Sequence, residues 1–253
     1  MGYKTSSGTT SENIIHPSIE PNKFIVGPNG YAESKHISKL LISYASDKFS
    51  PHGYEFSLAR VGQIAGPVRG KGLWNKTEWF RSLVLSSIHL CSIPSSLGSS
   101  LGRIDWVPVD ILADIIADLA LTNNVQHEVR SVRVFCSLNP NPKSWEDVRE
   151  ELVMDLCSIS SKSIDVVSLN IWIAKVRQDV ELKAGAGTVL KNGELGKILE
   201  NNPSAKLLEF YEDVLGGGEE GNVLETEKTK KASKALNDFK GVKREWIAKW
   251  ISE

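Results

Sequence analysis

A tyrosine and a lysine near the amino end of the chain have the types and the spacing of an acid–base pair. Tyr31 and Lys35 lie in the hexapeptide 30–35, four residues apart, which is the spacing of neighbours on one face of a helix. An ammonium group beside a phenol favours the phenolate and lowers a tyrosine pKa from its free value of about 10. Such a tyrosine can act as a general acid near neutral pH. The pair alone is also compatible with a tyrosine packed at a helix start beside a solvated lysine.

The segments around this pair must position it. Apolar residues at helical intervals predict a helix that starts at Tyr31 and ends near Pro51-His52-Gly53. The alternation in 54–61 predicts a strand, which runs into a loop at 62–67 that contains two glycines. In open α/β sheets, ligands bind outside the carboxyl ends of the strands. The loop at 62–67 is therefore a candidate ligand-binding loop.

The rest of the chain alternates at first between strands and helices and then becomes helix-rich. Residues 1–30 are predicted to be loop, and Asp110 and Ser144 fit helix N-caps. Further helices are predicted at 78–90, 111–121, 144–159, 169–182, 203–215 and 228–250, a further strand at 132–138, and short extended segments at 104–109 and 164–168. The fold class is therefore α/β, with a helix-rich second part.

Composition excludes several classes of protein. Of the 253 residues, 41% are hydrophobic and 24% charged, and the net charge is -1, so we expect neither a nucleic-acid partner nor an anionic membrane surface. No apolar run reaches the ~20 residues that span a bilayer. The three cysteines are odd in number and indicate buried thiols in a reducing, cytoplasmic compartment.

Neither the histidines nor the tryptophans form a recognisable binding set. The five histidines are scattered, so we interpret them as surface or loop residues and predict no metal site. The seven tryptophans are more typical of core packing than of a stacking platform.

An ordered set of motifs resembles one known family. The set comprises 30–35, Arg60 to Pro67, Trp74-Asn75, Glu78-Trp79, Trp106 to Asp110, Asn139-Pro140 with Trp145, and Lys206 to Tyr211. It resembles the thioester reductase domain at the C-terminal end of fungal nonribosomal peptide synthetase-like and polyketide synthase enzymes, and the similar domain of aminoadipate reductases. These are extended short-chain dehydrogenase/reductases. The resemblance covers nearly the whole chain and implies a Rossmann-type core with a helix-rich substrate lobe.

The resemblance implies hydride transfer from NADPH to a thioester held on the phosphopantetheine arm of a carrier protein. The product would be an aldehyde, or an alcohol after a second reduction. By resemblance, Tyr31 would protonate the developing oxyanion, and Lys35 would favour the ionised phenol and bind the nicotinamide ribose. Ser6 and Ser7 both lie at a suitable position for the family's third residue, and we prefer Ser7 as the hydroxyl that polarises the carbonyl.

The same resemblance places the loop formed by Gly62, Gln63 and Ile64 beside the nicotinamide. One part of the family's pattern does not occur in this sequence. A dinucleotide-binding half starts with a strand, a glycine-rich turn and a helix whose amino end holds the pyrophosphate. We therefore expect a single domain over 1–253, with 1–67 a remnant of the dinucleotide-binding core and 68–253 mainly substrate lobe and C-terminal helices.

Three hypotheses follow for function. The chain is a thioester reductase by descent, and is either a truncated gene product or a chain that needs a second chain to supply the cofactor half. Alternatively, it is a non-catalytic remnant whose helical lobe docks a carrier protein or another partner. In the third hypothesis it reduces a free small molecule such as a nucleotide sugar, which the tryptophan-rich segments after Pro67 disfavour.

Overall fold

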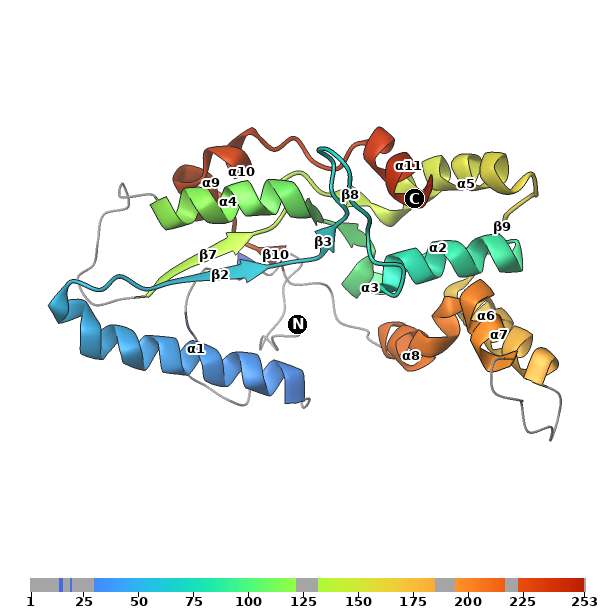
Figure 1. Cartoon of the computed structure of the whole chain (residues 1–253), viewed down its shortest axis with the longest axis horizontal. Helices are drawn as coiled ribbons and strands as arrows, with labels where there is room; N and C mark the ends of the chain where they lie inside the picture. Colours follow the sequence, from blue (N-terminus) through green and yellow to red (C-terminus); the bar gives the residue numbers. More distant parts are fainter. Residues whose placement is uncertain are drawn as a thin grey trace. The chain divides into compact units, whose positions relative to one another are not determined.

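A computed structural model describes residues 14–15, 19, 30–121, 132–184, 194–216 and 223–252. The chain forms two compact units (Figure 1), each assembled from segments distant in sequence. The first unit takes Met1–Ile64, Trp106–Asn141 and Gly221–Lys240, and the second takes Ala65–Asp105, Pro142–Glu220 and Gly241–Glu253. Helices combine with parallel strand pairs in both, so the predicted α/β class is confirmed. The prediction of a single domain divided near residue 67 stays a prediction.

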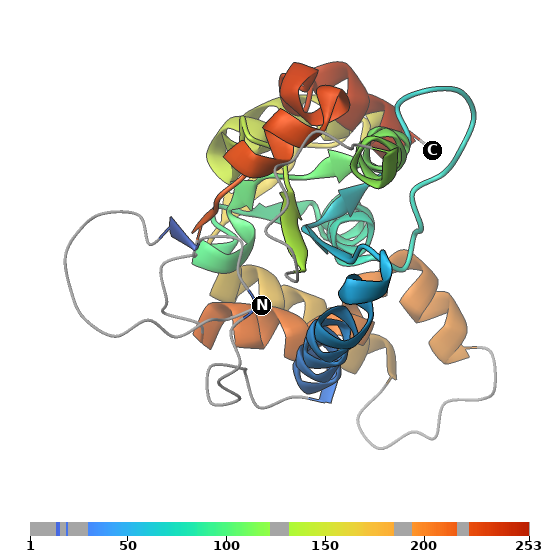
Figure 2. The ribbon, with the colours of Figure 1, turned by 90° about the vertical axis from the view of Figure 1, so that its left-hand side faces the viewer.

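The first unit is built on a parallel strand pair. Strands β2 (Ser57–Val61) and β7 (Arg133–Ser137) pair in register, from Ser57 opposite Arg133 to Val61 opposite Ser137. Helices α1 (Gly30–Phe49) and α4 (Val109–Leu121) lie on opposite sides of this pair (Figure 1 and Figure 2). The unit also contains η2 (Ser50–His52), β1 (Ile14–Ile15) paired with β10 (Val223–Leu224), β6 (Val107–Pro108), α9 (Glu227–Ala232) and α10 (Lys234–Asp238).

The core of the first unit lies on the α4 side of the strands. Helix α4 buries four aliphatic side chains at helical intervals, Ile111, Leu112, Ile115 and Leu119. Its Asp118 carboxylate accepts hydrogen bonds from the Ser233 hydroxyl and the Ala235 amide, both at 2.9 Å. The Cys136 amide of β7 donates to the Thr229 hydroxyl of α9 at 2.8 Å. These bonds fix α9 and α10 against the strand and the helix.

The second unit is helix-rich. Its first part contains α2 (Trp79–Leu90), β4 (Ser92–Pro94), α3 (Gly98–Leu101) and β5 (Arg103–Ile104). It continues with β8 (Lys143–Ser144), α5 (Trp145–Ser160), β9 (Asp165–Val167), α6 (Leu169–Ala184), α7 (Glu194–Asn201), η3 (Pro203–Leu207), α8 (Leu208–Gly216) and α11 (Arg244–Ser252). Strand β4 pairs with β9 in parallel, and β5 pairs with β8 in antiparallel orientation.

Tryptophans organise the core of the second unit. Trp145 and Trp172 are fully buried, and their indole nitrogens donate to the backbone oxygens of Pro94 and Ser92, each at 3.0 Å. A buried indole is stable when its N–H finds such an acceptor. The prediction that tryptophans pack in cores is confirmed for five of them, Trp74, Trp106, Trp145, Trp172 and Trp250.

Two predicted helices are broken in the structure. The prediction that Lys228 to Trp250 is mostly helical is confirmed, but the segment is divided into three helices, α9, α10 and α11. Ser233 interrupts it as the N-cap of α10, where its hydroxyl accepts from the Leu236 amide at 3.2 Å. The segment after Pro203 starts as the 3-10 helix η3 and becomes α-helical at Leu208. Helix α7 was not predicted. Among the described residues, no helix is both long and apolar enough to cross a membrane.

Candidate functional site

The structure brings Tyr31 and Lys35 together at the start of α1. The Lys35 ammonium nitrogen lies 5.3 Å from the centroid of the Tyr31 ring, which is cation–π geometry. Both side chains are exposed, and Tyr31 keeps 64% of its surface accessible. Helix α1 therefore presents the phenol outward, with the cation beside the ring.

The loop after β2 is fixed by two hydrogen bonds to its backbone oxygens. The Gln63 carbonyl oxygen accepts from the Val107 amide at 3.1 Å, and the Gln63 side-chain amide donates to the Ile64 carbonyl at 2.8 Å. Gly62 and Gln63 are half-buried, whereas Ile64, which opens β3 (Ile64–Ala65), is 39% exposed. The bond to Val107 joins two of the family motifs, 60–67 and 106–110, in one place.

The pair and the loop lie at one end of the strand pair. Figure 1 shows α1 running antiparallel to β2, so that its first turn lies at the end of the strands where Gly62 follows β2. This is the carboxyl end of parallel strands, where open α/β sheets bind ligands. Tyr31, Lys35, Gly62, Gln63 and Ile64 thus share one end of the first unit. Ser7 lies outside the described residues.

These residues fit one end of a nicotinamide cofactor. A phenol, an ammonium group and an ordered loop at the carboxyl end of β2 supply a proton donor and hydrogen-bond donors for a ribose and its ring. The described residues do not contain a strand, glycine-rich turn and helix for the pyrophosphate. The fit therefore extends to the nicotinamide ribose and not to the phosphates.

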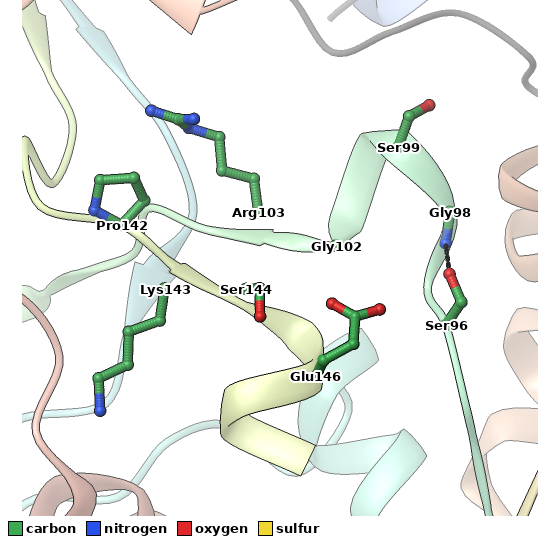
Figure 3. Close-up of a pocket in the computed structure, with 9 residues that line it drawn as sticks. All are labelled: Ser96, Gly98, Ser99, Gly102, Arg103, Pro142, Lys143, Ser144 and Glu146. Carbon is green, nitrogen blue, oxygen red and sulfur yellow. Dashed lines mark hydrogen bonds between the residues drawn. The ribbon is translucent and has the colours of Figure 1, made fainter. Parts of the chain in front are cut away.

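The second unit contains a polar pocket that the sequence did not indicate. It has a volume of about 410 Å³ and lies beside the β5–β8 ladder, where Arg103 is opposite Ser144. Figure 3 shows the Arg103 and Lys143 side chains pointing away from one another and the Glu146 carboxylate directed toward the centre of the view. The two cations therefore do not converge on one point of the pocket.

A charged cluster lies elsewhere in the second unit. The Asp179 carboxylate on α6 lies 2.7 Å from the Lys183 nitrogen, 3.1 Å from the His89 ring and 3.2 Å from the Asn202 side-chain nitrogen. Burial opposes ionisation of Asp179, but the hydrogen bonds from Lys183 and His89 outweigh it and hold its pKa below the ordinary value. The cluster joins α2, α6 and the start of η3, so we assign it to packing of the helices.

The interpretation of the histidines as surface or loop residues is wrong for His36. Its side chain is only 7% exposed, and it is one of the two buried residues of α1. Within the described ranges, no group of three or more His, Cys, Asp or Glu side chains is placed to hold a metal ion.

Comparisons with known proteins agree with the resemblance. Residues 3–116 match the family described as Male sterility protein, NAD_binding_4. The chain is 28% identical over 259 residues to a carboxylic acid reductase of Neurospora crassa, covering 99% of this chain and 23% of that protein. It is also 28% identical over 229 residues to the non-reducing polyketide synthase pigA of Monascus ruber, covering 88% of this chain and 7% of that protein.

A solved structure has the same fold. The terminal R domain of the myxalamid PKS-NRPS biosynthetic pathway superposes with a TM-score of 0.61 at 20% identity, covering 97% of this chain and 54% of that chain. The predicted resemblance to reductase domains of polyketide and nonribosomal peptide synthases is therefore confirmed. The chain spans about half of that solved chain and less than a quarter of the curated relatives named above.

Proposed function

We propose that this chain, whose residues 3–116 match the family described as Male sterility protein, forms part of an NADPH-dependent reductase of carrier-bound thioesters. The product is an aldehyde, or an alcohol after a second reduction. The observation that carries the proposal is the Tyr31–Lys35 pair on the first turns of α1, at the carboxyl end of β2. The relationship to a carboxylic acid reductase and to polyketide synthases supports it.

In this proposal each residue has a defined role. When bound, NADPH supplies the hydride. The Tyr31 hydroxyl donates a proton to the oxygen of the acyl carbonyl, where negative charge develops. Lys35 binds the nicotinamide ribose and favours the ionised phenol after that proton leaves. The backbone of Gly62, Gln63 and Ile64 borders the nicotinamide, and the Ser7 hydroxyl polarises the carbonyl.

Titration of the full chain with NADPH, followed by cofactor fluorescence, tests the proposal. We expect saturable binding that Lys35→Ala weakens by about tenfold, the effect of roughly one charge-assisted hydrogen bond. Lys48→Ala is the matched control, since Lys48 lies on the same helix with its nitrogen 5.6 Å from the ring of Phe49. Equal loss in both variants would contradict a specific role for Lys35. A full chain that does not bind NADPH would contradict use of the cofactor by this chain alone.

The non-catalytic hypothesis has its own support. The buried tryptophans Trp74, Trp145, Trp172 and Trp250 all belong to the segments of the second unit. A helical lobe of this kind could retain a docking role without reduction. Carrier binding by a chain that neither binds NADPH nor turns over a thioester would favour this hypothesis. Turnover of a free nucleotide sugar would favour the third.

A further inference from the structure

The loop that follows β3 carries exposed cations. Arg69, Lys71 and Lys76 are all exposed, and the sequence from Gly66 to Thr77 contains no Asp or Glu. Leu73 lies among them with 69% of its surface accessible. The whole chain has a net charge of -1, so the positive charge of this loop is a local feature. We call residues 67–76 the basic loop.

The C-terminal helix α11 holds the first part of the basic loop. The Lys249 ammonium group donates to the backbone oxygens of Pro67 and Gly70, each at 3.1 Å. The Trp250 indole nitrogen donates to the same Pro67 oxygen at 3.1 Å. Three hydrogen bonds from two side chains of α11 therefore fix the course of the backbone between Pro67 and Gly70.

The second part of the basic loop is held by aromatic packing. Trp74 is only 4% exposed, and its ring centroid lies 5.1 Å from that of Phe80 and 5.2 Å from that of Trp250. Its indole nitrogen also donates to the Glu78 carboxylate at 2.9 Å. The basic loop is thus held at both ends, and the residues between them present cations and one apolar side chain. A surface ordered before binding loses less conformational entropy when a partner docks.

We propose that the basic loop is the docking surface for the acidic face of a phosphopantetheinyl carrier protein. This inference rests on the proposed function, because a thioester tethered to a carrier reaches the site only with its carrier. The arm is joined to the carrier through a phosphodiester, which places a negative charge at the surface that must approach. Lys71 and Lys76 complement that charge, and Leu73 supplies an apolar contact among them.

The position of the basic loop in the chain fits this role. It begins directly after β3, and Ile64 of β3 closes the segment that the proposed function places beside the nicotinamide. A carrier bound to the basic loop would therefore contact residues that follow, in sequence, the segment proposed to border the nicotinamide. Opposite charges on the two surfaces increase the rate of encounter, and their attraction weakens as the salt concentration rises.

Binding of the full chain to an isolated holo-carrier domain from a fungal non-reducing polyketide synthase tests the docking surface. Biolayer interferometry would give the affinity at low and high salt. We expect the double variant Lys71→Glu with Lys76→Glu to weaken binding by about tenfold or more, and salt to weaken wild-type binding. The control, Lys162→Glu with Lys240→Glu, has the same change in net charge at two other exposed lysines and should bind as the wild type does. Leu73→Ala, which removes the apolar contact without changing the charge, should weaken binding with little dependence on salt.

A second measurement separates docking from chemistry. Turnover of free acyl-pantetheine should be equal in the wild type and the loop variant, whereas turnover of the acyl-carrier should fall in the loop variant. If the wild type reduces neither substrate, the proposed function fails, and the carrier affinities still test the docking surface. Equal carrier affinity in the wild type and the loop variant, or no carrier binding by the wild type, would overturn the inference. Unchanged melting temperatures exclude misfolding as the cause.

Discussion

Helices α1 and α2 both carry apolar residues at helical intervals but have very different surroundings. Helix α1 has 20 residues, and its buried side chains are those of His36 and Ser46. Helix α2 has 12 residues and buries seven side chains, including Phe80, Leu83 and Val84. In α1 the apolar side chains remain outside, with Ile37, Leu41 and Tyr44 each more than half exposed.

Apolar periodicity therefore predicts a helix, but it does not predict which elements pack against the apolar side chains. Helix α2 finds its partners in the second unit, where η3, α6 and β4 pack around it. The described residues of the first unit place its core on the α4 side of the strand pair. We therefore relate the exposed residues of α1 to the proposed function, and the buried residues of α2 to the stability of the second unit.

The largest expected effect concerns the exposed phenol. Tyr31→Phe should lower thioester reduction by about 10²- to 10⁴-fold, the usual contribution of a general acid. Stability should not change, because the lost hydroxyl belongs to a side chain that is 64% exposed. Tyr44→Phe is the control, since Tyr44 lies on the same helix and is 66% exposed. NADPH consumption and thermal denaturation measure the two effects, and unchanged turnover in Tyr31→Phe would refute the assigned acid.

The next effect compares the two helices directly. Leu83→Ala in α2 should lower the free energy of unfolding by about 2–5 kcal/mol, because it leaves a cavity at a fully buried position. Leu41→Ala in α1 should change it by no more than about 0.5 kcal/mol, since Leu41 is 62% exposed. Urea denaturation measures both. A large loss in Leu41→Ala would show that the outward face of α1 is covered in solution.

Packing density gives a smaller effect. A Cβ at Gly66 would lie 2.7 Å from Cδ1 of Trp250, so Gly66→Ala should destabilise the second unit by about 1–3 kcal/mol. At Gly30, the first residue of α1, a Cβ meets no heavy atom within 4 Å. Gly30→Ala should therefore be neutral or stabilising by up to about 1 kcal/mol. Differential scanning calorimetry would detect the contrast, and equal tolerance at both positions would contradict it.

The smallest effect is a pH dependence from the charged cluster. The pKa of Asp179 is lowered in the folded state, because the hydrogen bonds from Lys183 and His89 outweigh the opposing effect of burial. A depressed carboxyl pKa adds stability above the unfolded value of 3.8, and this stability is lost as pH falls through the folded pKa. Asp179→Asn should remove this part of the acid sensitivity. Chemical denaturation across that pH range measures the slope, and identical slopes in both proteins would argue against the assignment.

Local chemistry predicted several elements correctly. Ser144 was predicted to cap a helix, and its hydroxyl accepts from the Asp147 amide at 3.1 Å within a capping box. The predicted N-cap at Asp110 is wrong by two positions, because α4 starts at Val109 and Asp110 is the second residue of its first turn. Side-chain caps depend on residues within one helical turn, so the sequence carries this information directly.

In the candidate site, too, the sequence predicted some features and not others. The spacing of Tyr31 and Lys35 predicted their contact, because both lie on one helix. The pocket beside Arg103 and Ser144 could not be predicted, since those residues meet only through the β5–β8 ladder. The same holds for the basic loop, whose backbone is fixed by Lys249 and Trp250 from the far end of the chain.

The sequence alone predicted most of the helices, the longer strands, the contact between Tyr31 and Lys35 and the resemblance to reductase domains. The tertiary structure decided that β2 pairs with β7, that α1 exposes its apolar face, and that the C-terminal helix orders the basic loop. Periodicity and capping act over a few residues, so they can be read from neighbours along the chain. Strand pairing, burial and loop anchoring depend on contacts between segments far apart in sequence, and only the folded chain brings those segments together.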